Sequence, residues 1–121
     1  MSVAPDLQHW LDRADALAAG GCYFDAHEQL ETAWKAADGE TKVLLQGLIQ
    51  LAAGLHRLKL NPQKSAGAFY LLDRGLEKLR RERALLNAAS LVALETLITE
   101  IRRESRAPSG LRFGLRVIRK D

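Results

Sequence analysis

The sequence of 121 residues has a single cysteine, few aromatic residues and no long hydrophobic run. With Cys22 alone, the chain cannot form an internal disulfide or a zinc motif that uses two or more thiolates. No apolar run approaches the ~18 residues of a membrane helix, and the chain does not begin like a signal peptide. Neither a glycine-rich phosphate loop nor a nucleophile elbow is visible. We therefore expect a cytoplasmic protein without disulfides or membrane segments.

The charges of the chain are divided unevenly along its length. Residues 102–121 hold seven Arg or Lys and two acids, a net charge of +5, so that residues 1–101 carry −2 of the overall +3. A basic face for reading DNA is not expected on the body, and nucleic acid is not an expected partner. The basic end of the chain is the part suited to an anionic partner.

Apolar residues recur at helical spacing along most of the chain. This periodicity predicts an all-α fold, a compact bundle of about five antiparallel helices over residues 6–19, 23–37, 41–59, 62–82 and 88–104. The third helix is apolar nearly all round, which indicates a central, enclosed position. In the fourth, we expect Asn61 to cap the helix and Pro62 to take its first position. In the second, we expect Phe24 and Trp34 to face the core.

After residue 104 the helical pattern stops. The following stretch alternates apolar residues with basic residues or glycine, which predicts an extended, irregular, basic C-terminal arm. We therefore divide the chain into a single helical domain, residues 1–104, and an arm, residues 105–121. A chain of this length can bury one core without a metal or a disulfide.

Four glycines lie inside the third and fourth predicted helices. Each of them, Gly47, Gly54, Gly67 and Gly75, weakens its helix by ~1 kcal/mol relative to alanine. Because a glycine has no side chain, two helix backbones can approach each other closely there. We predict that these two helices pack at short distance.

Polar residues on the second and third helices fall at matching depths. If these helices form a hairpin that turns near residue 39, residues at equal depth have numbers that sum to about 78, because each helix rises ~1.5 Å per residue. The polar residues that then lie level with one another are His27, Glu28, Glu31, Gln46 and Gln50. Burying any of them unpaired would cost ~1–3 kcal/mol. We therefore expect one connected polar cluster between the two helices.

Two interpretations of this cluster stay open. In the first, it is a satisfied hydrogen-bond network that fixes how the two helices pair. For Glu28 the corresponding local role is a capping box with Asp25. In the second, the cluster is a metal-binding or hydrolytic site, because clustered polar groups are a frequent mark of function.

Several motifs stand together between residues 20 and 80, in the stretches GGCYFDAHEQLETAW, LLQGLIQLAAGLHRLKLNPQKSAGA and LLDRGLEKL. Together they resemble a small bacterial family known as domain of unknown function 309. The family's pattern is matched at Phe24, His27, Glu28, Glu31, Trp34, Gln46, Gly47, Gln50, His56, Asn61, Gly67 and Ala68. The resemblance implies an all-helical fold and, by the label that the family carries, a metal-dependent hydrolase of unknown small-molecule substrate.

If the family label holds, the segment His-Glu-x-x-Glu supplies the site. It is similar to the zinc-protease pattern His-Glu-x-x-His, in which residues four apart bind the metal and the intervening Glu is the base. His27 and Glu31 would then bind a divalent metal, zinc, manganese or iron, and Glu28 would be the catalytic base. The candidate for the third ligand is His56, which the hairpin places ~7 Å deeper than His27.

A non-enzymatic function competes with this one. Residues 47–79 are similar in cadence to tetratricopeptide repeats, whose stacked helix pairs bind peptides in a groove. In this alternative the chain is a helical interaction module, the polar cluster is structural, and the partner is a protein. Self-association into a homo-oligomer is also left open.

Overall fold

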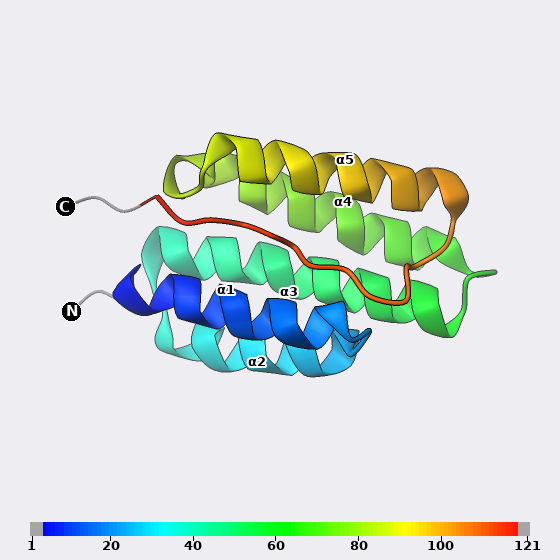
Figure 1. Cartoon of the computed structure of the whole chain (residues 1–121), viewed down its shortest axis with the longest axis horizontal. Coiled ribbons are helices and arrows are strands. Elements are labelled where there is room, and N and C mark those ends of the chain that lie inside the picture. Colours follow the sequence, from blue (N-terminus) through cyan, green and yellow to red (C-terminus); the bar gives the residue numbers. More distant parts are fainter. Residues whose placement is uncertain (1–3, 119–121) are drawn as a thin grey trace.

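The computed structural model describes residues 4–118 and is all-α, as the periodicity predicts (Figure 1). Its helices are α1 (Ala4–Ala19), α2 (Tyr23–Ala36), α3 (Gly39–Leu60), α4 (Ser65–Arg81) and α5 (Ala88–Glu104), with a short 3-10 turn, η1 (Arg83–Leu85), before α5. Short turns join consecutive helices, which therefore run antiparallel. No helix within residues 4–118 is long and apolar enough to cross a membrane.

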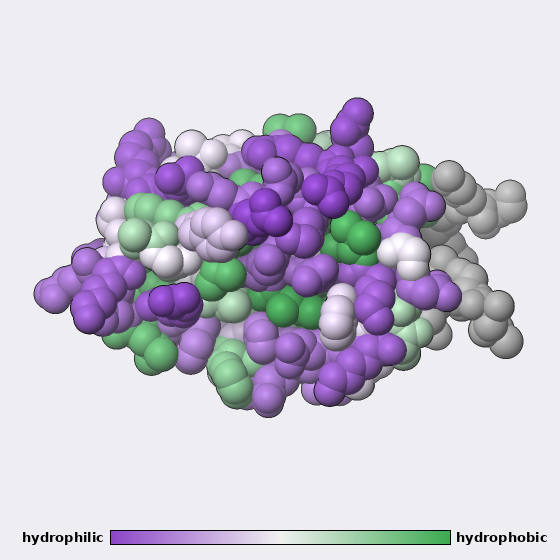
Figure 2. All heavy atoms as spheres, turned by 180° about the vertical axis from the view of Figure 1, so that it is seen from behind, coloured by the Kyte–Doolittle hydropathy of each residue, from purple (hydrophilic) through white to green (hydrophobic). Residues whose placement is uncertain are grey.

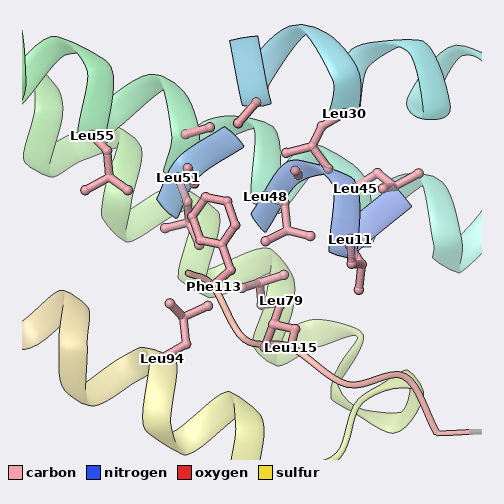
Figure 3. Close-up of a cluster of buried hydrophobic side chains, with 14 of the residues drawn as sticks. Leu11, Leu30, Leu45, Leu48, Leu51, Leu55, Leu79, Leu94, Phe113 and Leu115 are labelled. Carbon is pink, nitrogen blue, oxygen red and sulfur yellow. The ribbon is translucent and has the colours of Figure 1, made fainter. Parts of the chain in front are cut away.

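Helix α3 is the centre of the bundle. It lies between α2 and α4, and its side chains are buried on most of its circumference, at Leu44, Leu45, Leu48, Leu51, Ala52, Leu55 and Leu58. Figure 3 shows leucines of the other four helices and two residues from the end of the chain gathered around it. The central position predicted from its all-round hydrophobicity is confirmed.

Helices α3 and α4 pack backbone against backbone at glycines. A Cβ atom added to Gly75 would lie 2.6 Å from the carbonyl oxygen of Gly47, and one added to Gly54 would lie 3.0 Å from a carbonyl oxygen of α4. The close approach predicted for these two helices is thus confirmed at three of the four glycines. The fourth, Gly67, faces a side chain instead: a Cβ there would lie 2.9 Å from a guanidinium nitrogen of Arg57.

The start of α4 differs from the prediction. Helix α3 continues to Leu60, and the N–H of Asn61 donates to the carbonyl oxygen of Arg57 at 2.9 Å. Because Pro62 disfavours helical torsion angles in the residue before it, Asn61 has φ −147° and ψ 77°, and the chain turns before α4 begins at Ser65. Asn61 therefore ends α3 and does not cap α4.

The chain after α5 is extended, as predicted, and its residues 106–118, the C-terminal segment, run between α1 and α5 (Figure 1). Leu111, Phe113 and Leu115 are buried in the same core as the helices, and Figure 3 shows Phe113 and Leu115 among its leucines. The alternating Arg112 and Arg116 are exposed. Burying each of the three apolar side chains is worth ~1.5–3 kcal/mol. The boundary predicted after residue 104 therefore marks a change of backbone conformation, and the core continues across it.

Polar side chains of α1 and α2 hold the backbone of the C-terminal segment. Their hydrogen bonds join the Asp15 carboxylate to the N–H groups of Phe113 (2.8 Å) and Gly114 (3.1 Å), the Gln8 side-chain oxygen to the N–H of Val117 (2.7 Å), and the Tyr23 hydroxyl to the carbonyl oxygen of Pro108 (2.9 Å). Burial raises the pKa of the Asp15 carboxyl, although both of its hydrogen bonds act to lower it. Burial also raises the pKa of Tyr23 to about 12. Residues 119–121 of the predicted arm lie outside the described part of the chain.

Candidate functional site

The buried face of α2 is turned by about one residue from the predicted face. Its buried residues are Tyr23, Ala26, Leu30 and Ala33. Phe24, which we expected in the core, is 49% exposed. Tyr23 takes the core position instead, because its hydroxyl finds a carbonyl acceptor in the C-terminal segment. Trp34 is partly buried and packs against the core.

Around Phe24 the surface has a small hollow. The Phe24 ring stacks on the imidazole of His27, with ring centroids 5.9 Å apart, and lies at 5.4 Å from that of His56. The hollow has a volume of about 140 Å³ and is completed by Ala53 and Arg57. We call these five residues the Phe24 hollow. The hairpin argument predicts that His56 lies deeper than His27, and in the structure the ring of Phe24 lies close to both imidazoles.

The other candidate residues of α2 lie at or beside this hollow. The Nε2 atom of His27 is 3.9 Å from Oε2 of Glu31, one turn further along the helix, and the Glu31 side chain is 44% exposed. Glu28 is exposed. It forms no capping box with Asp25, because α2 begins at Tyr23 and its N-cap residue, Cys22, makes no side-chain capping bond. Among the described residues, the Nδ1 atom of His27 and the Nε1 atom of Trp34 are buried without a hydrogen-bond partner.

The two glutamines of α3 do not join His27 and the glutamates. Gln46 is exposed. The side-chain oxygen of Gln50 accepts a hydrogen bond from Nζ of Lys78 on α4, at 2.9 Å. The predicted connected cluster between α2 and α3 is therefore not formed: its members point to α2, to α4 or to solvent. A match in depth fixes the level of a residue along a helix but not the side on which it lies.

The fit of these residues to a metal site is incomplete. His27 and Glu31 are near enough to share an ion, but the Phe24 ring packs against both His27 and His56. A catalytic zinc needs three protein ligands and a water. Over residues 4–118, no three side chains of His, Cys, Asp or Glu are grouped so that they could hold a metal ion. As placed, the candidate ligands do not fit a three-ligand site, and their role in metal binding stays a prediction.

Cations line the α3–α4 face that carries the Gln50–Lys78 hydrogen bond. We call Arg57, Arg74, Lys78 and Arg81 the cation row. Burial lowers the pKa of Lys78, and the positive charges of Arg74 and Arg81 lower it further, while Glu77 opposes them. Figure 2 shows the molecule from the side opposite the C-terminal segment, where hydrophilic side chains cover most of the surface and hydrophobic ones form small separate patches.

A larger open cavity, about 510 Å³, lies between α5 and the C-terminal segment. Its apolar walls come from Leu97, Ile101, Pro108 and Leu111, and its charged edges from Glu100 and Glu104 on one side and Arg106 and Arg112 on the other. Leu97 is 41% exposed here, although the helical spacing of the apolar residues in 88–104 predicts it on the inward face of that helix. None of the residues singled out in the family's pattern lines this cavity.

The five residues of the Phe24 hollow all lie on the hairpin α2–α3 of this small all-α protein. Residues 11–69 match the model of a family described as "Domain of unknown function (DUF309)". The matched segment runs from the middle of α1 to the first turns of α4 and contains all five residues of the hollow. The match supports the resemblance that the motifs indicate. No curated protein and no solved structure matches the sequence.

Proposed function

We propose that this chain is a helical interaction module that receives one apolar side chain of a protein partner in the Phe24 hollow. The observation that carries the proposal is the position of Phe24, half exposed and in contact with two imidazoles on neighbouring helices. Aromatic residues at the surface, fixed by their neighbours, are frequent anchors of protein interfaces.

The size of the hollow supports a single side chain as its occupant. A cavity of about 150 Å³ holds a benzene-sized group, and the Phe24 hollow measures about 140 Å³. Its walls are mostly apolar, with the ring of Phe24 and the methyl group of Ala53 between polar His27, His56 and Arg57. This arrangement of an apolar centre with polar edges is that of a small binding pocket.

A peptide display library, selected on the immobilised chain, tests this function. Selected peptides are expected to share one bulky apolar residue, and Phe24→Ala to weaken their binding at least about tenfold, the effect of losing one interface anchor. The matched control is Tyr70→Ala, because Tyr70 is also an exposed aromatic residue, at 63%, but does not line the hollow. Peptides that bind both variants as well as the unchanged chain would contradict the proposal.

A second candidate is the metal-dependent hydrolase that the family label implies. It is supported by the 3.9 Å pair of His27 and Glu31 and by the nearness of His56 across the Phe24 ring. For a three-ligand site, the His56 imidazole must move to join His27 and Glu31, because the three are not grouped so that they could hold a metal as placed. Glu28, the proposed base, is exposed beside this pair.

The metal content of the purified chain separates the two candidates. The chain is incubated with zinc, manganese or iron, dialysed, and measured by mass spectrometry of the element and of the protein. One ion per chain that is lost in His27→Ala would favour the hydrolase. An unchanged, substoichiometric content in both chains would favour the interaction module.

A further inference from the structure

We propose that the partner segment is acidic, and that its carboxylates lie along the cation row while its apolar residue occupies the Phe24 hollow. This inference rests on the proposed interaction function and names the chemistry of the partner. The row begins at the edge of the hollow, because Arg57 is one of the five residues that line it while its guanidinium lies over Gly67 of α4.

Arg57 and Lys78 reach across the junction of α3 and α4 in opposite directions. The guanidinium of Arg57, on α3, lies over Gly67 of α4, where even a Cβ atom would come within 2.9 Å. The ammonium of Lys78, on α4, donates to Gln50 of α3 at 2.9 Å. Gln50 and Arg57 are seven residues apart and thus lie on one face of α3, ~10 Å from each other along its axis. The two cations therefore mark the ends of a path over one surface.

The path is also positive between its two ends and just beyond Lys78. On α4, Arg74 lies one turn before Lys78, on the side of Gly67, and Arg81 lies one turn after it; both act on the pKa of Lys78. Like charges at these spacings destabilise a helix by a few tenths of a kcal/mol per pair. Arg74 pairs with Glu77 at 3.0 Å, and both side chains are about half exposed, so that this pair compensates little.

The other arginines of α4 and α5 pair with acids, two of them with acids of another helix and Arg103 with Glu100 of its own helix. Arg80 pairs with Glu95, and Arg102 pairs with Asp73 at 3.0 Å. Within the described residues, Arg57, Lys78 and Arg81 make no ion pair. The cation row is thus the part of this surface whose charge is left for an external anion.

The opposite edge of the hollow is acidic, and this favours a peptide over a nucleic acid. Glu31 lies beside His27 at 3.9 Å on α2, and Glu28 is exposed on the same helix. A nucleic acid, with a phosphate at every nucleotide, would be repelled where its backbone crossed this edge. A peptide can place its apolar residue in the Phe24 hollow and its acidic residues only on the side of the cation row. At ~3.3 Å per extended residue, acids about three residues from the apolar one would reach Lys78.

Two fluorescent peptides test the inference on the full chain. One has a leucine, a Gly-Ser spacer and a run of glutamates, and the other has glutamine in place of each glutamate. In low salt, we expect the acidic peptide to bind at least about tenfold more tightly, and to lose this advantage as salt is raised, because exposed charges are screened. We expect Lys78→Gln with Arg81→Gln to remove the same advantage.

The control is Arg106→Gln with Arg112→Gln, which removes the same charge from the cavity beside α5. This pair is expected to change the affinity less than about twofold, because the charges lie away from the cation row. Thermal melting of each variant checks that it is folded. If this control pair, and not the change at Lys78 and Arg81, weakens the acidic peptide, the inference is wrong and the C-terminal segment is the anion site.

The outcomes also separate this inference from the proposed function. Equal affinity for the two peptides, with both weakened by Phe24→Ala, would overturn the acidic partner and keep the hollow. No binding of either peptide that depends on Phe24 would overturn both. A single-stranded oligonucleotide that binds the row more tightly than the acidic peptide, and without need of Phe24, would assign the surface to nucleic acid instead.

Discussion

Two regions of the molecule differ in whether their polar side chains have hydrogen-bond partners: the region beneath the C-terminal segment and the outer face of α2. Beneath the segment, Asp15, Gln8 and Tyr23 each have hydrogen-bond partners in its backbone. On α2, His27 and Trp34 each keep a buried nitrogen without a partner, and the Glu31 side chain, whose carboxylate lies 3.9 Å from Nε2 of His27, is close to half exposed. Of these two regions, the one under the segment is therefore the one whose polar groups help to hold the fold together.

The difference has a physical cause. An extended segment between helices leaves backbone N–H and C=O groups without the bonds that a helix or sheet would give them, and burying such groups unpaired costs ~1–3 kcal/mol each. Side chains of α1 and α2 must therefore supply the partners. On α2 the carboxylates of Glu28 and Glu31 border solvent and are under no such requirement, whereas the buried nitrogens of His27 and Trp34 keep this cost until a ligand or another group pairs with them.

The largest difference between the two regions is expected from their phenylalanines. Phe113→Ala should lower the free energy of unfolding by ~3–5 kcal/mol, because it leaves a cavity in the core. Phe24→Ala should lower it by less than about 1 kcal/mol, because that ring is half exposed. Urea unfolding followed by circular dichroism measures both. Equal losses would mean that Phe113 and Phe24 contribute alike to the core, which would contradict the difference between the two regions.

A smaller effect is expected at the carboxylates. Asp15→Ala removes the acceptor of two backbone N–H groups and should lower the free energy of unfolding by ~2–4 kcal/mol. Glu31→Ala, the matched change on α2, removes one partly exposed contact with the His27 imidazole and should cost less than about 0.5 kcal/mol. The same unfolding experiment compares them. A loss for Glu31→Ala as large as for Asp15→Ala would revive the structural network predicted on α2.

Removing an unpaired polar atom is expected to have a slight effect of opposite sign. His27→Leu keeps an apolar body of similar size and eliminates the buried Nδ1 atom, so the free energy of unfolding should stay the same or rise by up to ~1 kcal/mol. Differential scanning calorimetry shows it as an unchanged or higher Tm. A clear fall in Tm would show that His27 has a structural partner, and the hollow would then be part of the scaffold.

The helices could be predicted well because helical periodicity is local. The range predicted for α5 is the observed one, Ala88–Glu104, and the helix-weakening glycines correctly indicated where α3 and α4 meet. The side of α2 that faces the core could not be predicted in this way. Tyr23 and Phe24 are adjacent aromatics, and the choice between them depends on an acceptor at Pro108, 85 residues further along the chain.

The candidate site was predicted in part for the same reason. The hairpin argument placed His56 ~7 Å deeper than His27, and in the structure both line one hollow, because the Phe24 ring lies close to both imidazoles. It could not show that Gln50 faces α4, because that argument considered α2 and α3 alone. Asp15 was missed, although a signal existed. With Leu7, Leu11, Ala14 and Ala18 it continues the buried stripe of α1, and an acid in such a stripe needs a partner.

The smallest effect is expected in the pH dependence of stability at Asp15. Because burial raises the pKa of its carboxyl, the folded chain binds this proton more tightly than the unfolded chain does. The free energy of unfolding should therefore fall as the pH rises from below the ordinary carboxyl value of about 3.8 through the raised one. Asp15→Asn cannot titrate, so its deficit relative to the unchanged chain should shrink over that window.

Urea unfolding of both chains at a series of pH values from 3 to 7 measures this difference. All other carboxyl groups are common to the two chains, so their contributions cancel to first order. A deficit that grows with pH would mean that the hydrogen bonds from Phe113 and Gly114, together with the charge of Arg112, outweigh burial and lower the pKa. In that case the carboxylate would stabilise the C-terminal segment by its charge, and the contrast with the exposed Glu31 would be sharper still.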